Sequence, residues 1–572
     1  MKRISKFLLF VALTVVAVSC GKDKTREEKV AIMIQQIESP FLVANMNVQT
    51  LMDKSQVMEE GTLPYTYYQV ISFFLGKELT GIDYNTKAQL VVGEGESFLP
   101  SYYGIFKIED EKVFTELLEV EANADIKEED GMKYAIKEKE QYCVVWNEEF
   151  AIISDVQSGL MALFSGGKDN GDKKVKKLIR IIASAEEGEA DPEMLAFLQK
   201  DADIAIHFDG EGFYGYMGAM MEIGEAFSDQ PKDPSQEAVK DLYKGTLCDM
   251  YINFNDGSVD MEIEADFSED LKEKLNFLAD KGVDDKLLNF GKTENPLMTM
   301  AYSMDIQGGV DYMKEVNGDD AEEMFEDMEN SGMSIDEIQE ALTGEFVVMV
   351  DEVIKQEEVY DFGYDEPITV KNDKGIFGIV LAVSDKGLIE NKIAEIMAKQ
   401  DVAMNSQEEA AMNKATMELL PNGVIHSGEA FVFLTDAILF ASNDSSWTNM
   451  VVNGTTKKVK NPEGVLQQKP ITMYANLNKL SSMESVEDDQ KQIAGMFDSF
   501  RMVLDLEGGS LTLKMKDGSK NSLYLLTQAV GAILADVEKM SNPDMEAELE
   551  DALQDTEDSF DKLEEDLKQE AH

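Results

Sequence analysis

The stretch CDMYINFNDGSVDMEIE, residues 248–264, decides the fold class of this chain. Apolar and polar side chains alternate on both sides of Asp256-Gly257, a dipeptide that tolerates the positive φ of a tight turn. A similar stretch, FRMVLDLEGGSLTLKMK, occupies residues 500–516, and its apolar positions coincide with those of the first at an offset of 252 residues. Each stretch predicts an antiparallel β-hairpin, the second with its turn at Gly508-Gly509, and the pair indicates an internal duplication.

Further pairs of similar stretches keep the same order along the chain. A single pair would not establish a repeat, because alternating strands resemble one another by chance, but several pairs in one order predict two homologous halves. The further pairs are MNVQTLM at 46–52 with MDIQGGV at 304–310, LTG at 79–81 with LTG at 342–344, YYGIFKIEDEK at 102–112 with IFGIVLAVSDK at 376–386, and VVWNEEFAIISD at 144–155 with VFLTDAILFASN at 432–443.

The duplication divides the chain into a leader, a tether, two repeated halves and a tail. Each half is predicted to hold a larger module followed by a smaller one that carries the hairpin. The predicted ranges are 1–19 for a lipoprotein signal peptide, 20–30 for a lipidated tether, 31–285 for the first half with modules at about 31–190 and 191–285, 290–543 for the second half with modules at about 290–465 and 466–543, and 544–572 for the tail.

Amphipathic helical patterns accompany the strands in both halves. Ser334 and Glu337 form the S-x-x-E pattern of a capping box, and Gly344 occupies the position of a left-handed C-cap. Long, fully apolar runs typical of parallel strands do not accompany these patterns. The sequence therefore predicts an α+β fold in which amphipathic helices cover antiparallel sheets and hairpins on one face.

The first twenty residues have the pattern of a bacterial export signal. Lys2, Arg3 and Lys6 precede the apolar run at 7–18, which is too short to cross a bilayer. Small residues then precede Cys20, as in the lipobox of bacterial lipoproteins, although an alanine stands where leucine is usual. We expect Cys20 to be acylated and to anchor the mature chain to a membrane, with plain secretion as the alternative.

The chain is strongly acidic. It has 52 Lys and Arg residues against 112 Asp and Glu residues, a formal net charge of -60. Nucleic acid is therefore excluded as a partner, because binding it requires clustered cations, and anionic lipid is disfavoured except through the anchor. The charge predicts solubility and surface self-repulsion. Affinity for divalent cations or for a basic partner is the alternative, without a D-x-[DN]-x-[DN]-G calcium motif to support it.

Catalytic and metal-binding motifs are absent from the sequence. The histidines are His207, His426 and His572, so an H-E-x-x-H zinc motif does not exist, and no P-loop, G-x-G-x-x-G or G-x-S-x-G motif occurs. His426 and Ser427 are adjacent, but neighbours in an extended strand point to opposite sides. We therefore predict no catalytic residue, no metal site and no cofactor.

Cysteine and aromatic residues are predicted to be structural. Cys143 and Cys248 lie in apolar runs, which favours buried free thiols, while a disulfide between them stays open in an exported protein. The 33 methionines indicate flexible core filler more than a soft-metal site. Four aromatic residues lie in or beside strand-like segments: Tyr102, Tyr103, Trp146 and Trp447. We expect them in the core or on a sheet face more than in a sugar-binding face.

The tail at 544–572 has its own pattern. Leu549, Leu553, Phe560 and Leu563 keep a heptad-like spacing among acidic residues. This predicts an acidic amphipathic helix. It either docks on its own domain or frays, or it binds a partner helix.

Together these features resemble a family of large uncharacterised lipoproteins of Bacteroidetes. The resemblance rests on the relaxed lipobox, the acidity and the duplicated α+β halves that open with the strands FLVANMNV and LMTMAYSMD. It covers nearly the whole mature chain. The resemblance implies a Gram-negative envelope and attachment to the outer membrane, on its periplasmic or its outer face, and it supplies no activity.

Two classes of function follow. The first, which we favour, is a non-catalytic envelope lipoprotein that binds a protein or glycan or supports an assembly. The alternative is a hydrolase that acts on a polymer through carboxylates. An enzyme should bring two or more carboxylates with shifted pKa values into one partly buried cleft, whereas a binding protein should expose an apolar or aromatic patch.

Overall fold

A computed structural model describes most of the chain between its two ends. The described residues are 24–57, 80–94, 100–120, 123–137, 141–156, 170–226, 244–278, 281–331, 333–360, 368–403, 417–483, 486, 491 and 493–541. The predicted signal peptide, Cys20 and the acidic tail lie outside them.

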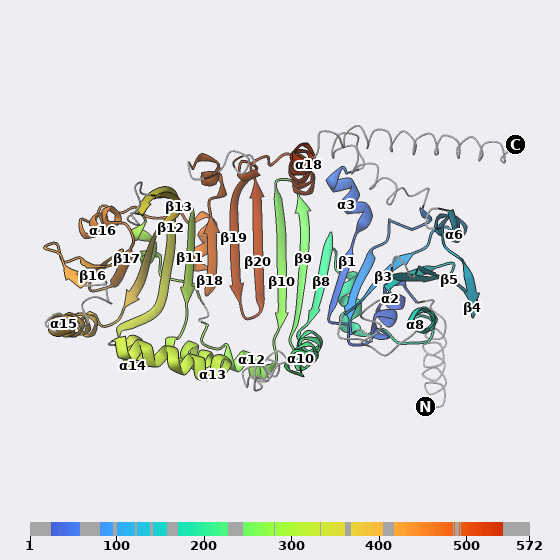
Figure 1. Ribbon diagram of the computed structural model, residues 1–572, viewed down its shortest axis with the longest axis horizontal. Helices are drawn as coiled ribbons and strands as arrows, with labels where there is room; N and C mark the ends of the chain where they lie inside the picture. The colour runs from blue at the N-terminus through green and yellow to red at the C-terminus, as the bar shows by residue number, and fades with distance from the viewer. Residues whose placement is uncertain are drawn as a thin grey trace, which may run out of the picture.

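The fold is mixed α+β with antiparallel strands, as the sequence predicts. It is built on one large sheet (Figure 1). The first ten strands are β1 (Leu42–Met46), β2 (Ala88–Gly93), β3 (Ser101–Lys107), β4 (Lys127–Glu129), β5 (Met132–Lys137), β6 (Tyr142–Trp146), β7 (Phe150–Asp155), β8 (Ile204–Asp209), β9 (Leu247–Asn255) and β10 (Ser258–Asp266). The remaining strands are β11 (Met298–Ser303), β12 (Leu342–Tyr360), β13 (Ile368–Val383), β14 (Met417–Leu419), β15 (Ile425–Ser427), β16 (Ala430–Leu434), β17 (Ile438–Ser442), β18 (Ile471–Ala475), β19 (Phe497–Asp505) and β20 (Gly508–Met515).

Helices lie along the margins and on the faces of this sheet (Figure 1). In the first half they are α2 (Arg26–Gln35), α3 (Val48–Ser55), α6 (Glu111–Val120), α8 (Asn170–Ser184), α9 (Pro192–Gln199), α10 (Gly210–Ala226) and α12 (Glu269–Lys274). In the second half they are η1 (Asp285–Phe290), α13 (Ile306–Ser331), α14 (Ile335–Ala341), α15 (Lys386–Ala403), α16 (Ser445–Val452), η2 (Pro462–Gln467), η3 (Leu477–Ser482) and α18 (Ser522–Ser541). No described helix is both long and apolar enough to cross a membrane.

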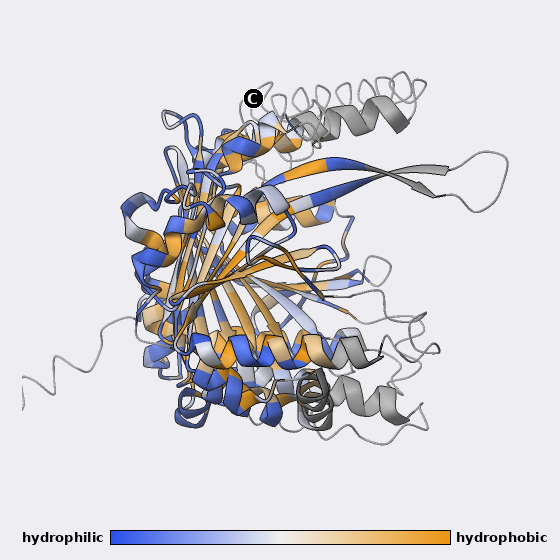
Figure 2. Ribbon diagram, turned by 90° about the vertical axis from the view of Figure 1, so that its left-hand side faces the viewer, coloured by the Kyte–Doolittle hydropathy of each residue, from blue (hydrophilic) through white to orange (hydrophobic). Residues whose placement is uncertain are grey.

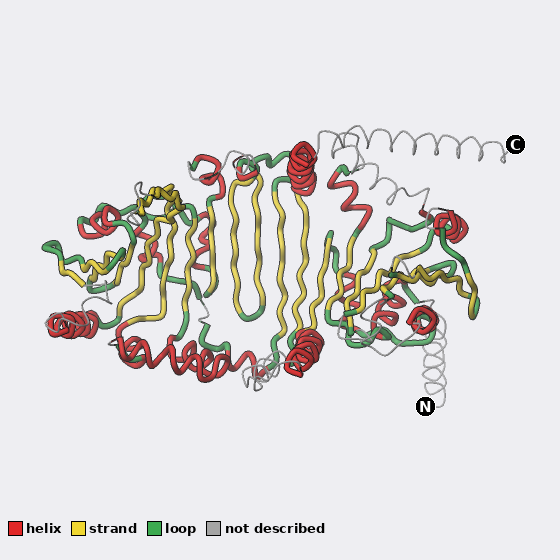
Figure 3. The backbone as a smooth tube through the Cα atoms, viewed as in Figure 1, coloured by secondary structure: helices red, strands yellow, loops and turns green. Residues whose placement is uncertain are grey.

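The strand order is the same in both halves. The first half runs β4-β5-β6-β7-β3-β2-β1-β8-β9-β10. The second runs β14-β15-β16-β17-β13-β12-β11-β18-β19-β20. The two closing hairpins meet where β10 pairs with β20, with Met261 opposite Leu511. The strands of both halves therefore form one continuous sheet (Figure 3). The module boundaries proposed from the sequence stay predictions.

A side-chain to main-chain contact is also repeated. In each half, a Ser-Asx pair at the end of a strand binds the main chain of the neighbouring strand. In the first half, the Ser154 hydroxyl donates to the carbonyl of Tyr102 at 2.7 Å, and Asp155 Oδ1 accepts from the amide of Tyr102 at 2.9 Å. In the second half, the Ser442 hydroxyl donates to the carbonyl of Phe377 at 2.7 Å, and Asn443 Oδ1 accepts from the amide of Phe377 at 3.0 Å. The contacts make Phe377, and not its neighbour Ile376, the counterpart of Tyr102. Aligning Tyr102 with Ile376, as the sequence suggests, would put the two side chains on opposite faces.

Two large cores lie on one face of the sheet. In the first half, α2, α8 and α9 contribute to a buried cluster, and in the second half η1, α16 and η2 do so. Val43 and Val91 belong to the first cluster, and Val347 and Trp447 to the second. Burial of these side chains is the main term that holds each half together.

Two local predictions are wrong in detail. The second hairpin turns at Leu506-Glu507, while Gly508 lies in β20, where an added Cβ would clash with a main-chain oxygen of β10. Ser334 and Glu337 do form the predicted capping box, but α14 ends at Ala341 in a strand-like C-cap. Gly344 keeps a positive φ of 86° inside β12, because a side chain there would meet the main chain of Met304.

The helices at the margins connect the two halves. The segment that follows β10 packs on α13 of the second half, with an ion pair of 2.6 Å between Lys274 and Glu315 and a ring contact between Phe277 and Tyr312. The helix that follows β20, α18, packs on α3 of the first half. Each half thus supplies a packing element to the other.

Candidate functional site

The face of the sheet opposite the two large cores is apolar across both halves. Strand register fixes which side chains share this face, since successive residues of a strand alternate sides. The middle row crosses from β2 to β13 without a polar side chain and consists of Ala88, Met46, Ile204, Ile252, Met261, Leu511, Met502, Met473, Met300, Val348 and Ile379.

Two flanking rows extend this surface along the strands. One consists of Leu90, Ala44, Ile206, Met250, Ile263, Gly509, Leu504, Ile471, Tyr302, Phe346 and Leu381. The other crosses fewer strands and consists of Phe254, Val259, Leu513, Phe500, Ala475, Met298, Val350 and Phe377. We call these three rows the apolar face. It spans about 48 Å across the strands and about 14 Å along them at ordinary sheet spacings.

The apolar face is not part of a core among the described residues. Three alanines in it are buried, but nearly all its larger side chains are half-buried, and none belongs to a buried cluster of the described chain. Leu90 on β2 is 37% exposed, and Phe377 on β13, at the other end of the face, is 39% exposed. Tyr102 on β3, next to β2, is 49% exposed. A surface of this extent is larger than the scattered apolar residues of an ordinary protein surface.

The other side of the central strands is polar. Glu262 and Ser510, which follow Met261 and precede Leu511, are exposed, and Arg501 precedes Met502. The central hairpins are therefore apolar on one side and polar on the other. Figure 2 shows apolar strand segments and, above and below them, helices that extend to one side of the sheet.

Helices border the apolar face on all sides. At one margin α10 places Phe213 against Phe208 of β8, with ring centroids 5.2 Å apart. At the other margin α18 lies beside β9 and β10. At the two ends, the same side of the sheet is buried under α6, where Phe114 contacts Trp146, and under α14 and α15, where Ile389 packs in a cluster with Leu439.

A histidine cluster lies on the side of the sheet that carries the two large cores. His207 Nδ1 lies 2.7 Å from Asp249 Oδ1, and the Tyr251 hydroxyl donates to Asp249 Oδ2 at 3.0 Å. Burial and the charge of Asp249 raise the pKa of Tyr251. The Lys200 ammonium lies 4.3 Å from the centre of the Tyr251 ring. No serine, threonine or cysteine appears among the described contacts of His207, so the cluster lacks the nucleophile of a triad.

A buried lysine forms a second cluster. Lys174 Nζ donates to Ser101 Oγ at 3.0 Å and to Tyr103 Oη at 3.2 Å. Ser101 is 3% exposed and Lys174 is 7% exposed. A serine beside a lysine can form a nucleophile and base, but a pair buried this deeply is not open to substrate. Its hydrogen bonds satisfy a charge inside the first core.

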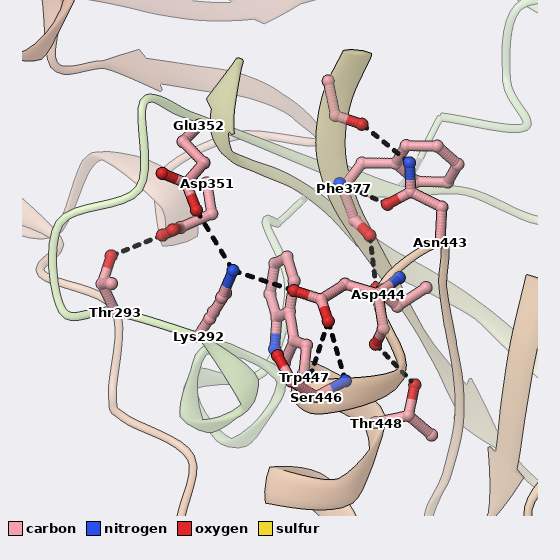
Figure 4. Close-up of polar contacts among 12 residues, drawn as sticks. Lys292, Thr293, Asp351, Glu352, Phe377, Asn443, Asp444, Ser446, Trp447 and Thr448 are labelled. Atoms are coloured by element: carbon pink, nitrogen blue, oxygen red, sulfur yellow. Dashed lines mark hydrogen bonds and ion pairs between the residues drawn. The ribbon is translucent and has the colours of Figure 1, made fainter. Parts of the chain in front are cut away.

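A third polar cluster surrounds the start of α16 (Figure 4). Lys292 forms ion pairs with Asp444 at 2.8 Å and with Glu352 at 3.2 Å, and Asp444 caps α16 by accepting from the amide of Ser446 at 2.7 Å. Burial would raise the pKa of Asp444, but hydrogen bonds from Lys292 and Ser446 keep it below its usual value. The cluster is a helix cap linked to neighbouring strands.

Acid–base catalysis finds no support among the described carboxylates. A general acid of a glycosidase needs a raised pKa. Each described carboxyl group whose pKa departs clearly from its ordinary value has it lowered by hydrogen bonds or ion pairs: Asp83, Asp260, Asp284, Glu337, Glu429, Asp444, Glu463 and Asp517. Within the same residues, no group of His, Cys, Asp and Glu is arranged to hold a metal ion.

The residues singled out from the sequence occupy separate places. Cys143 and Cys248 are free thiols, the first buried in the first core and the second half-buried in β9. Tyr103, Trp146 and Trp447 are fully buried, as predicted for core aromatics. The His426 ring stacks on Phe431 at 4.5 Å. Cys20 and His572 lie outside the described residues. Those of them that the structure describes are therefore not brought into one site.

Comparison with known protein families and with curated proteins finds no match. Among solved structures, crystal forms I and III of TP0453 each match with a TM-score of 0.24 and 9% sequence identity, over 43% of this chain and 86% of that one. Crystal form IV matches with a TM-score of 0.24 and 10% identity, over 41% and 79%. At these TM-scores the likeness carries no argument about this chain.

Proposed function

We propose that this protein is an envelope lipoprotein that is anchored through Cys20 and acts by binding, without catalysis. The observation that carries the proposal is the apolar face. Contiguous apolar surface of more than a few hundred Å² on a soluble chain marks an interaction site. A chain this acidic has charged residues in excess. A sheet face without charge, outside every buried cluster of the described residues, is therefore a specific feature and not a result of composition.

The anchor and the face have separate roles in this proposal. Acyl chains on Cys20 would hold the protein on a Gram-negative membrane, with the outer membrane as the expected location. The sheet would then present the apolar face to a ligand or envelope partner. Burial of apolar area contributes about 25 cal/mol per Å² of surface removed from water. A ligand that covers even part of the face therefore gains appreciable free energy.

The hydrolase alternative has less support. It requires a cleft with carboxylates whose pKa values are pushed apart. The shifted carboxylates described above are scattered over both halves, and all shift in the same direction. A glycan partner is also less well supported, because sugar hydroxyls need hydrogen-bonding groups and the apolar face offers only the Tyr302 hydroxyl, whose described contact is Met300 Sδ at 3.8 Å.

The proposal is tested in two steps. Replacing Cys20 by Ala should abolish incorporation of labelled palmitate and release the chain from membrane fractions. For the face, the mature chain with Cys20→Ser is titrated with a dye that fluoresces in apolar surroundings. Met261→Glu should weaken dye binding strongly, while Glu262→Gln on the opposite side of the same strand should leave it unchanged. Equal dye binding by both variants would contradict the proposal.

A further inference from the structure

We infer that the apolar face binds the hydrocarbon chains of single amphiphile molecules, such as a fatty acid or a phospholipid. This inference rests on the proposed binding function and names its ligand. It selects one occupant among three that an apolar sheet face could take: a folded partner protein, a second copy of this chain, or hydrocarbon chains.

The chemistry of the face favours a ligand without polar groups. Its three rows contain one hydroxyl, on Tyr302, and neither an amide nor a charge. Protein interfaces need about one hydrogen bond for each 100–200 Å² of contact, and an extended peptide segment laid here would leave its own polar groups unpaired. A hydrocarbon chain has no such groups, so its contact with the face leaves nothing unsatisfied.

The borders of the face disfavour a second sheet. Two sheets pack about 10 Å apart, and an α-helix with its side chains is about 10–12 Å thick. Helices at both margins extend to one side of the sheet, and α6 at one end and α15 at the other bury the same face (Figures 1 and 2). A second copy, or a broad flat partner, would meet these helices before it reached the central strands. A slender chain would not.

The side chains in the middle of the face suit ligands of variable shape. Methionine is flexible and polarisable, and it adapts to irregular apolar partners. Five of the residues in the middle row are methionines: Met46, Met261, Met502, Met473 and Met300. At about 48 Å, the row is long enough to hold an extended acyl chain lengthwise.

The net charge separates single amphiphiles from a bilayer surface. A formal charge of -60 is repelled by anionic lipid headgroups, and this repulsion acts over about a Debye length. A sheet bordered by helices also cannot lie flat on a bilayer. The ligand is therefore taken as individual molecules whose chains lie on the face while their headgroups stay in water.

Photo-crosslinking in living cells tests this inference with the complete lipidated chain. A photoreactive phenylalanine analogue replaces Met261 on the apolar face or, as the matched control, Glu262 on the opposite side of β10. After irradiation, intact-mass measurement of the chain carrying the analogue at 261 should show an added mass equal to that of a membrane lipid or fatty acid. The control should show no such addition.

The outcomes separate the inference from the proposed function. A protein crosslinked at 261 but not at 262 would overturn the hydrocarbon ligand and leave the binding function standing. No adduct above the control would contradict both. If the chain with the analogue at 261 does not accumulate, Phe500, where the replacement keeps an aromatic ring, serves as the second position, with Arg501 as its control.

Discussion

Two adjacent valines in β12 lie on opposite faces of the sheet, one in the second core and the other in the apolar face. Val347 is fully buried in the second core, whereas its neighbour Val348 is half-buried in the middle row of the apolar face. Val347→Ala and Val348→Ala make the same chemical change in the same strand, so differences in intrinsic strand preference largely cancel. The two variants therefore report how completely each side of the sheet is covered.

The expected magnitudes follow from burial. Val→Ala removes two methyl groups, worth about 1.6 kcal/mol of transfer free energy when fully buried, and the remaining cavity adds about 1 kcal/mol. Val347→Ala should thus lower the free energy of unfolding by about 2–3 kcal/mol. Val348 already contacts solvent and leaves no closed cavity, so its replacement should lower that free energy by less than about 1 kcal/mol.

Urea unfolding followed by tryptophan fluorescence measures both variants, with the protein stripped of bound ligand. Trp447 lies in the same core as Val347 and reports on its loss. Adding a fatty acid should then stabilise the wild type and the Val347 variant by the same increment, and the Val348 variant by a smaller one. Equal destabilisation by the two substitutions without ligand would refute the reasoning, because the apolar face would then be an ordinary core.

Three further predictions concern strain, pH and thiol reactivity. Gly344→Ala should lower the free energy of unfolding by more than about 2 kcal/mol, because the added Cβ meets main-chain atoms at a residue with positive φ. Gly428 also has a positive φ, of 60°, but open space around it, so Gly428→Ala should lower that free energy by only about 1 kcal/mol in the same urea assay. The pKa of Asp444 is lower in the folded chain than in the unfolded chain, where it is near 3.9. The ionised Asp444 therefore stabilises the fold above that pH, and this contribution is lost as the pH falls through the folded-state pKa. The free energy of unfolding of Asp444→Asn should accordingly depend less on pH below about 4 than that of the wild type. Burial raises the pKa of the Cys143 thiol to about 12. Alkylation at pH 8, followed by peptide mass, should therefore label half-buried Cys248 first. Faster labelling of Cys143 would contradict its place in the core.

The strands of the central hairpins could be predicted from the sequence, because their alternation is strict on both sides of the turn. The position of the second turn could not. A Gly-Gly pair is favourable in a tight turn, but in this chain Gly508 serves the close pairing of β20 with β10. Pairing between strands far apart in sequence leaves no local signal, and a shift of two residues keeps every side chain on its face.

The sequence does not predict the apolar face. Each hairpin shows one apolar side, and a single apolar side normally indicates a core beneath a helix. The apolar sides of both hairpins join into one surface because β10 and β20 pair with Met261 opposite Leu511. The local sequence pattern of each hairpin does not specify this register. The excess of methionine is the one signal in the sequence for an adaptable surface, but methionine also fills cores, so the count alone does not separate the two.

Fluorescence quenching by brominated acyl chains tests the central claim most directly. A tryptophan is placed on the apolar face by Phe254→Trp and, as the control, on the opposite side of β9 by Asn253→Trp. Bromine quenches only at short range, so the account predicts saturable quenching of the Phe254→Trp variant beyond the background of the two native tryptophans, and none beyond it for the control. Equal quenching of both variants, or none of either, would contradict the claim that this face holds hydrocarbon chains.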